Sequence, residues 1–197
     1  MMNECTVFIG DSVTDCGRLE LPPYGDGYVR DIVASGRLAG TVVNVGTSGH
    51  RLVDLLPRWE RDVIAAAPTR VSIAIGINDT WRRYDDNDPT DVADFERNYR
   101  AVLERTRLAT NAELVLCEPF LLPVEDVMHT WREDLDPKID VVHRLSEEFG
   151  AALVPFDSGL RALLAGHSMP ELAADGIHPS ALGHRIMADL WLDCVLG

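Results

Sequence analysis

The sequence alternates between short apolar runs and longer segments with helical periodicity, and this alternation restricts the possible folds more than any other feature. The short runs are rich in Val, Ile and Leu, as strands buried on both faces are; they cover residues 5–9, 41–45, 70–75, 113–117 and 152–156. The helix-like segments cover residues 28–38, 52–67, 91–109, 137–149, 159–164 and 181–195. A strand–helix unit repeated in this way predicts an α/β fold with a five-stranded parallel sheet, helices on both faces and right-handed crossovers.

The length of the chain fits one such sheet. With 197 residues, of which 46% are hydrophobic, the chain is long enough for one core but too short for two ordinary domains. No stretch rich in Pro, Gly and Ser divides it, and no segment is repeated. We therefore expect residues 1–197 to form a single domain. Pro57 lies inside the segment 52–67, where we expect it to interrupt the helix.

The charge of the chain argues against several classes of partner. It contains 32 Asp and Glu against 18 Lys and Arg, which gives a formal net charge of -14. Because an acidic surface repels phosphate backbones and anionic lipids, we expect no nucleic-acid partner and no membrane partner. In addition, no apolar run approaches the ~20 residues needed to span a bilayer.

The N-terminal residues and the cysteines bear on the compartment. Residues 1–5 lead straight into the first predicted strand without the basic and apolar regions of a signal peptide, so we expect a cytoplasmic protein. The four cysteines lie far apart in the sequence, at Cys5, Cys16, Cys117 and Cys194. We expect free thiols and, because no Cys/His cluster has ligand spacing, no metal site. Without a Gly-x-Gly-x-x-Gly or P-loop motif, no cofactor is expected either.

Polar motifs follow the first three predicted strands, where parallel sheets bind their ligands. Gly-Asp-Ser ends at Ser12 after the first strand, Asn-Val-Gly ends at Gly46 after the second, and Gly-Ile-Asn-Asp places Asn78 after the third. Before the last helix, Asp-Gly-Ile-His-Pro carries Asp175 and His178, three residues apart. The sequence therefore gathers a serine, an amide and an Asp–His pair near one edge of the sheet.

These residue types form a complete set for acyl transfer. A serine hydroxyl becomes nucleophilic when a base takes its proton, and His178 is the candidate base for Ser12. Asp175 would hold the imidazole in the required tautomer. The backbone N–H groups of Ser12 and Gly46 and the side-chain amide of Asn78 are candidates for an oxyanion hole. The triad expected is thus Ser12, His178 and Asp175.

Each motif taken singly also has a structural interpretation. Gly-Asp-Ser after a strand is often a turn with a helix cap, Asn-Asp is a natural turn pair, and Asp175 and His178 could simply start the last helix. The remaining histidines are weaker candidates for the base, because four have no local Asp partner and one lies inside a predicted helix; they are His50, His129, His143, His167 and His184. What favours catalysis is that separate motifs converge on one edge of the sheet.

Together the four motifs resemble those of the SGNH hydrolases of the GDSL esterase/lipase superfamily, which are named for a Ser, a Gly, an Asn and a His in separate blocks. The resemblance extends from residue 7 to the last helix. It implies a flavodoxin-like three-layer α/β/α sandwich. It also implies an acyl-enzyme on Ser12, an oxyanion hole from Ser12, Gly46 and Asn78, and a triad completed by Asp175 and His178.

A narrower resemblance concerns residues 8–18 and 71–84, which are similar to the corresponding segments of intracellular acetyl-xylooligosaccharide esterases. It implies a small-molecule ester substrate, namely a short-chain, acetyl ester on carbohydrate such as xylo-oligosaccharides, and a homo-oligomer. Trp81 and Asp11 are then candidate substrate contacts. One alternative is a GDSL-type lipase, thioesterase or lysophospholipase that acts on longer acyl or CoA esters. Another is a non-catalytic flavodoxin-like binding module.

Overall fold

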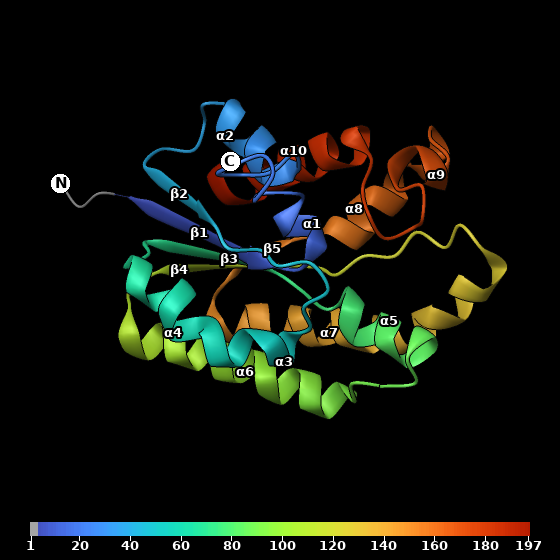
Figure 1. The fold of residues 1–197 in the computed structure, drawn as a ribbon, viewed down its shortest axis with the longest axis horizontal. Coiled ribbons are helices and arrows are strands. Elements are labelled where there is room, and N and C mark those ends of the chain that lie inside the picture. Colours follow the sequence, from blue (N-terminus) through green and yellow to red (C-terminus); the bar gives the residue numbers. More distant parts are fainter. Residues whose placement is uncertain (1–3) are drawn as a thin grey trace.

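The computed structural model describes residues 4–197, and within this range five strands form one parallel sheet (Figure 1). The strand order is β2-β1-β3-β4-β5, which is the flavodoxin-like order expected from the resemblance. The strands lie within one to two residues of their predicted ends: β1 (Cys5–Gly10), β2 (Thr41–Asn44), β3 (Arg70–Ala74), β4 (Glu113–Cys117) and β5 (Ala152–Val154). The predicted fold class is confirmed.

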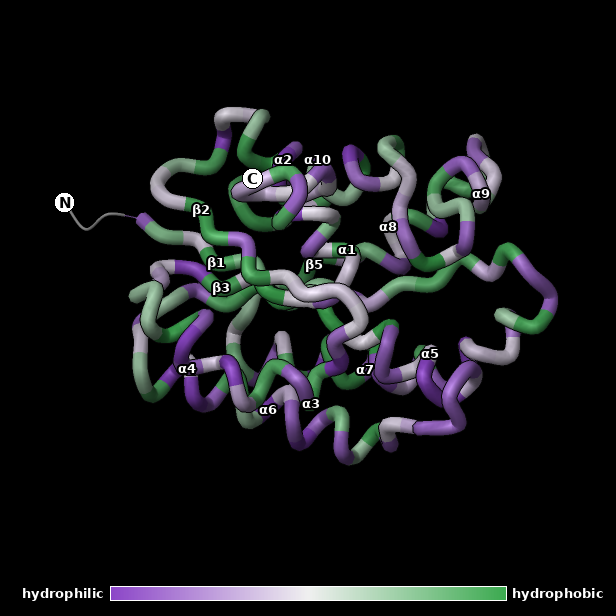
Figure 2. Tube along the Cα trace, in the orientation of Figure 1, coloured by the Kyte–Doolittle hydropathy of each residue, from purple (hydrophilic) through white to green (hydrophobic). Residues whose placement is uncertain are grey.

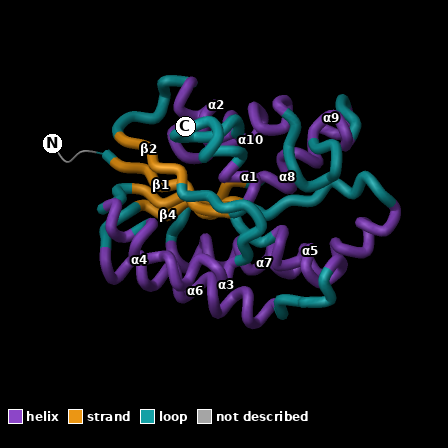
Figure 3. Tube along the Cα trace, in the orientation of Figure 1, coloured by secondary structure: helices purple, strands orange, loops and turns teal. Residues whose placement is uncertain are grey.

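Helices cover both faces of the sheet, which gives the three-layer sandwich seen in Figures 1 and 3. One layer contains α2 (Tyr28–Ala34), α8 (Phe156–Ala162) and α10 (Ala181–Leu196). The opposite layer contains α3 (Leu52–Leu55), α4 (Trp59–Asp62), α6 (Val92–Ala109) and α7 (Arg132–Phe149). Shorter elements complete the described chain: α1 (Ser12–Asp15), α5 (Ile77–Asp85), α9 (Met169–Leu172) and the 3-10 turns η1 (Leu56–Arg58), η2 (Ile64–Ala66), η3 (Asp126–Trp131) and η4 (Leu163–Ala165).

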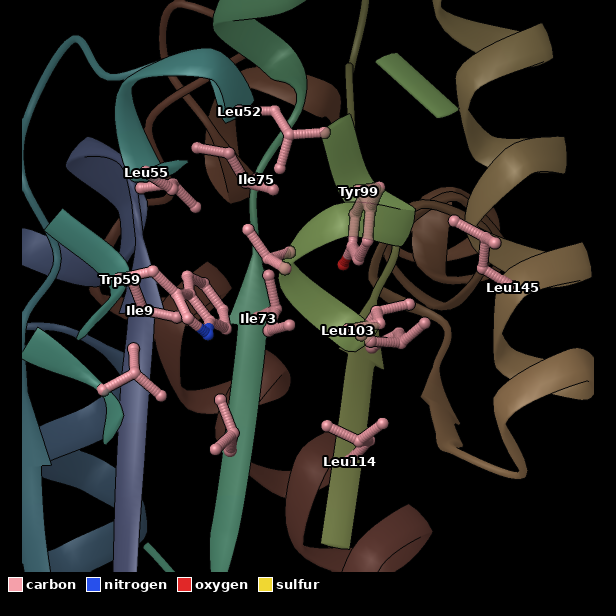
Figure 4. Packing of buried hydrophobic residues seen from close by; sticks show 14 of the residues in the cluster. Ile9, Leu52, Leu55, Trp59, Ile73, Ile75, Tyr99, Leu103, Leu114 and Leu145 are labelled. Carbon is pink, nitrogen blue, oxygen red and sulfur yellow. The ribbon is translucent and has the colours of Figure 1, made fainter. Parts of the chain in front are cut away.

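Alternating strand residues supply the two sides of the core, as expected for side chains that point to opposite faces. Ile9 and Ile73 pack with Trp59 on the side of α4 and α6, as Figure 4 shows. Phe8 and Val115 pack on the other side, against α2 and α10. Hydrophobic residues are accordingly concentrated along the strands, whereas α4 and α6 carry hydrophilic stretches (Figure 2). Burial on both faces explains why the strands appear in the sequence as continuous apolar runs.

Prolines lie inside two of the predicted helical segments, and the structure treats them differently. The segment 52–67 is divided into α3, η1, α4 and η2, and Pro57 lies in η1, so the expected interruption is confirmed. In contrast, α7 begins at Arg132 and contains Pro137 in its interior, whereas the sequence predicted a start at Pro137. The first turns of α7 form because η3 leads directly into them and the fully buried Leu135 anchors them to the core.

The largest difference is α5, which follows β3 where the sequence predicted a loop and where residues 78 and 79 are a natural turn pair. The first four residues of α5 are all buried, and the carboxylate of Asp79 accepts a hydrogen bond from the backbone N–H of Leu52 at 3.0 Å. Local turn propensity of the Asn-Asp pair is therefore outweighed by tertiary contacts. The consequence is that Asn78 sits on the first turn of a helix rather than on a flexible loop.

Candidate active site

Ser12 is the first residue of α1 and follows the fully buried strand β1. Asp11 caps this one-turn helix, since its Oδ1 accepts a hydrogen bond from the N–H of Val13 at 3.0 Å. The cap fixes the chain where it leaves the sheet. In Figure 1, α1 and α5 lie beyond the same end of the sheet, where the strands have their carboxyl ends.

A hydrogen-bonded chain joins Ser12 to two residues that lie more than 160 positions later. Ser12 Oγ lies 2.9 Å from His178 Nε2, and His178 Nδ1 lies 2.6 Å from Asp175 Oδ2. The other oxygen, Asp175 Oδ1, accepts the backbone N–H groups of Ile177 and His178. The structure thus brings together the three residues that the sequence predicted as a triad.

The charge state of Asp175 fits this chain. Partial burial raises the pKa of its carboxyl, but the hydrogen bonds from the side chain and backbone of His178 outweigh this effect and leave the pKa below its ordinary value. The carboxylate therefore stays ionised and accepts the Nδ1 proton of His178. The Nε2 atom is then free to accept the proton of Ser12 Oγ.

Gly46 does not present a free N–H group, which corrects the expected role of this residue. Its N–H donates to Asn44 Oδ1 at 2.9 Å, and Asn44 Nδ2 in turn donates to the carbonyl of Thr14 at 2.7 Å. A Cβ on Gly46 would lie 2.4 Å from the backbone nitrogen of Asp15. Gly46 is therefore required for the close packing of its loop against α1, and its amide is already engaged.

Asn78 is 2% exposed, and its Nδ2 donates one hydrogen bond to the carbonyl of His50 at 3.0 Å. The amide has a second N–H, which this bond leaves available. The contact holds the end of the loop of residues 45–50 against the start of α5. Gly49, next to His50, has a φ of 78°, a conformation that favours glycine.

Asp11 was expected to contact substrate, and the structure corrects this expectation. The residue is 2% exposed, so its carboxyl is covered by protein, and it serves as the cap of α1. Burial raises the pKa of Asp11 to about 7, and the negative charge of Asp79 adds to this shift. Burial likewise raises the pKa of Asp79 to about 6. Two buried carboxyls thus lie close to the nucleophile helix and α5.

Three aromatic rings form a chain of contacts that begins beside His178. The half-buried Trp81 has its ring centroid 6.2 Å from that of His178 and 6.3 Å from that of Trp131. Trp131 stacks on Tyr84 with centroids 5.0 Å apart and an interplanar angle of 10°. The sequence marked Trp81 as a candidate substrate contact, but it did not predict the stack with Trp131 and Tyr84, because this stack joins α5 to η3 through tertiary packing.

His184, the weaker candidate for the base, lies elsewhere. Its Nε2 is 3.4 Å from Cys16 Sγ, and its Nδ1 accepts the N–H of Tyr28 at 3.2 Å. Burial lowers the pKa of His184 to about 4, so this imidazole is neutral near pH 7.

Other expectations concern cysteines, metals and membranes. All four cysteines in the described part of the chain are free thiols, as predicted. Among residues 4–197, no three His, Cys, Asp or Glu side chains are grouped so that they could hold a metal ion. Over the same residues, no helix combines the length and the apolar character that crossing a membrane requires.

A serine, an imidazole and a carboxylate bonded in line beyond a parallel sheet are the arrangement of a serine hydrolase. The chain matches the model of the GDSL-like Lipase/Acylhydrolase family over residues 8–186, and it belongs to that family. It is 36% identical over 203 residues to an acetylxylan esterase from Geobacillus stearothermophilus, an alignment that covers 96% of this chain and 92% of the relative.

Solved structures agree with this assignment. The fold is similar to that of a GDSL-like protein from Parabacteroides merdae, with a TM-score of 0.92, 32% identity and coverage of 98% of this chain and 95% of the other. It is also similar to Axe2, an acetylxylan esterase from Geobacillus stearothermophilus, with a TM-score of 0.86, 34% identity and coverage of 96% and 93%. A variant of Axe2 described as an acetyl-xylooligosaccharide esterase has a TM-score of 0.85, 34% identity and coverage of 96% and 93%.

Proposed function

We propose that this protein is a serine esterase that removes acetyl groups from acetylated xylo-oligosaccharides through an acyl-enzyme on Ser12. The observation that carries the proposal is the chain from Ser12 Oγ to His178 Nε2 at 2.9 Å and from His178 Nδ1 to Asp175 Oδ2 at 2.6 Å. The class of reaction follows from the family, and the substrate follows from the acetylxylan esterase that is 36% identical over most of both chains.

In the proposed reaction, His178 takes the proton of Ser12 Oγ as this oxygen attacks the ester carbonyl. The imidazolium then gives the proton to the departing sugar hydroxyl, and the acetyl group remains on Ser12. A water molecule, deprotonated by His178, attacks the acetyl carbonyl; as acetate leaves, the imidazolium returns this proton to Ser12 Oγ. Throughout, the ionised Asp175 keeps the imidazole oriented and stabilises its positive charge.

The proposed oxyanion hole uses the N–H of Ser12, the free N–H of the Asn78 amide and a third donor from the loop of residues 45–50. We assign this third donor to Gly49 in place of Gly46, whose N–H already binds Asn44. In support, Gly49 N–H has no hydrogen-bond partner among residues 4–197, and the next residue bonds directly to Asn78. Preorganised donors of this kind stabilise the tetrahedral intermediate.

Trp81 is the proposed contact for the sugar. An indole presents an apolar face to the C–H groups of a pyranose ring, and Trp81 is half-buried beside His178. The net charge of -14 also favours a neutral substrate over acyl-CoA or a phospholipid surface. The longer-chain lipase, thioesterase and lysophospholipase alternatives, and a non-catalytic module, have no comparable support.

The proposal also covers the cellular compartment and the assembly state of the protein. Four free thiols agree with a reducing, cytoplasmic compartment. A homo-oligomer is also proposed; the exposed leucines Leu19 and Leu21 would contribute apolar surface to a contact between subunits. Sedimentation of the purified protein tests the assembly state.

The experiment that tests the proposed function compares the wild-type protein with Ser12→Ala. We expect the wild type to hydrolyse p-nitrophenyl acetate and to release acetate from acetylated xylo-oligosaccharides, and the folded variant to lose on the order of 10⁴- to 10⁶-fold in kcat. p-Nitrophenyl esters of longer acyl chains and an acetyl-CoA substrate are assayed beside these. A preference for long chains or for the CoA ester, or wild-type turnover by Ser12→Ala, would contradict the proposal.

A further inference from the structure

Arg58 is a buried cation that the triad does not use. It ends η1 on the α4 side of the sheet, and it is 8% exposed. Its guanidinium donates hydrogen bonds to the carbonyl of Val45 and to Thr47 Oγ1, and lies 3.3 Å from His50 Nδ1. On its other side, Nε forms an ion pair with Asp62 at 2.7 Å. One side chain thus holds three positions of the loop of residues 45–50.

The same loop contacts both other parts of the proposed oxyanion hole. Toward Ser12, the backbone N–H and the Oγ of Ser48 donate to Asp15 Oδ2 at 3.1 and 2.7 Å, and Thr47 N–H donates to the carbonyl of Gly10 at 3.0 Å. Toward α5, the carbonyl of His50 accepts the amide of Asn78. A shift of this loop therefore changes the distances between the oxyanion donors and Ser12.

The chemistry of arginine suits this task. The guanidinium is planar and always charged, and its five N–H groups form a rigid fork that can reach several acceptors at once. His50 can be one of these acceptors because burial, together with the nearby Arg58 charge, lowers its pKa and keeps the imidazole neutral. Asp62, whose carboxylate lies 2.7 Å from Arg58 Nε, balances the positive charge of the buried guanidinium.

We propose that Arg58 is a positioning residue for ester hydrolysis: by bonding Val45, Thr47 and His50 together, it holds the loop of residues 45–50 in the geometry of the oxyanion hole. The inference rests on the proposed function of this site and adds a residue that no sequence motif indicated. Arg58 acts through the loop and does not touch the substrate. Its loss therefore lowers kcat while substrate binding persists.

The test compares Arg58→Gln, Arg58→Lys and Arg58→Ala with Arg61→Gln, with p-nitrophenyl acetate as substrate. Arg61 is a matched control, because it also pairs with Asp62 but is exposed and, among residues 4–197, has no hydrogen bond to the loop. A displacement near 1 Å at a reacting centre costs on the order of 10²-fold, so we expect Arg58→Gln to lose about 10- to 100-fold in kcat with KM changed less than about threefold. Arg58→Lys, which keeps the charge but not the fork, falls between this variant and the wild type, and Arg61→Gln stays at the wild-type rate.

Added guanidinium provides a readout that a general loss of stability would not give. In Arg58→Ala, guanidinium ion at concentrations well below those that unfold the protein is expected to restore kcat several-fold, whereas the same concentration of sodium chloride does not. Urea-unfolding curves confirm that each assayed variant is folded, and if Arg58→Ala does not fold, rescue is measured on Arg58→Gln or Arg58→Lys.

Three results would overturn the proposal: a folded Arg58→Gln with wild-type kcat, a rise in KM without a fall in kcat, or no rescue by guanidinium. The outcome is separable from that of the proposed function. If Ser12→Ala keeps wild-type activity, the esterase assignment itself is wrong. If Ser12→Ala is inactive while the Arg58 variants match the wild type, only the positioning role fails.

Discussion

The two halves of the candidate triad are built in different ways. Ser12 follows a strand that is buried along its whole length, and it starts a helix that Asp11 caps from inside the protein. Asp175 and His178 lie on a loop before α10, and their side chains are 53% and 43% exposed. The nucleophile half is therefore held by the core, whereas the base half lies largely in solvent.

The base half is held mainly by local contacts. Asp175 Oδ1 accepts two N–H groups of its own loop, and an antiparallel bridge joins Ala173 to Pro179. Besides the contact of His178 with Ser12, a backbone hydrogen bond links the N–H of Leu122 to the carbonyl of Gly176 at 2.9 Å. The difference teaches that an Asp–His pair can be preformed by a short sequence, whereas the oxyanion donors need the sheet and its helices to hold them.

Asp175→Asn changes the exposed half of the candidate triad, and we expect it to have the largest effect on kcat in the comparison of the two halves. The amide oxygen can still accept the two backbone N–H groups, so the loop stays folded, but it cannot stabilise the imidazolium. We expect kcat to fall by about 10²- to 10⁴-fold. The lower end of this range is smaller than the loss in a buried triad, because water partly replaces the carboxylate at this exposed position. Steady-state kinetics with p-nitrophenyl acetate measure the effect. An unchanged rate would reduce Asp175 to a structural role in its loop.

Asn78→Ala tests the buried half. Removing one oxyanion donor is expected to lower kcat by about 10²- to 10³-fold with little change in KM. Loss of the bond to His50 also lowers the free energy of unfolding by about 1 kcal/mol, which a urea titration detects. Asn111→Ala, exposed at the other end of the sheet, is the control. If KM rises while kcat is unchanged, Asn78 is not a donor of the oxyanion hole.

The buried half should also carry more of the pH dependence of stability. The unfolded chain releases the Asp11 proton near pH 4, whereas the folded protein keeps it up to its pKa of about 7. Because the folded state binds the extra proton, this contribution is complete below pH 4 and is lost as the pH rises through 7. Asp11→Asn keeps a capping oxygen and removes the titration.

We therefore expect the fall in unfolding free energy between pH 5 and pH 8 to be smaller in Asp11→Asn than in the wild type, by about 2–3 kcal/mol. Urea titrations at both pH values measure the change. Asp189→Asn, an exposed carboxylate on α10, should behave like the wild type. Equal pH profiles for all three proteins would contradict a neutral, buried Asp11.

The smallest expected effect is on KM, from a change at Trp81, which lies beside His178 in the exposed half of the candidate triad. Trp81→Ala should raise KM for acetylated xylo-oligosaccharides by about three- to tenfold, the loss of about one aromatic contact. KM for p-nitrophenyl acetate, which has no sugar ring, should not change. Parallel assays of acetate release and p-nitrophenol release compare the two. Equal effects on both substrates would indicate that Trp81 supports His178 and does not bind the sugar.

The sequence predicted the sheet well because each strand is buried on both faces and therefore forms a continuous apolar run. It also predicted Ser12, His178 and Asp175 as neighbours, because parallel strands bring their carboxyl ends to one edge. It missed α5, where the turn propensity of residues 78 and 79 is outweighed by burial. No local pattern marked Arg58, whose contacts lie 8 to 13 residues earlier in a loop without regular structure.

Two site residues show where sequence reasoning stops. A glycine after a strand is compatible with either a free amide or close packing, and the hydrogen bond from Gly46 to Asn44 decides for packing. An aspartate beside a nucleophile is compatible with either substrate contact or capping, and the burial of Asp11 decides for capping. In both cases the side chain's surroundings, and not its chemical type, determine what it does.

By itself, the sequence determined the five strands and supplied the candidate reacting groups and the local Asp–His motif, because periodicity and short-range spacing depend on neighbouring residues. Only the tertiary structure decided which amides are free, which carboxyls are buried and which cation holds the loop of residues 45–50. These properties depend on contacts between segments far apart in the chain and on the exclusion of water between them. Burial and hydrogen-bond competition arise only when those segments pack.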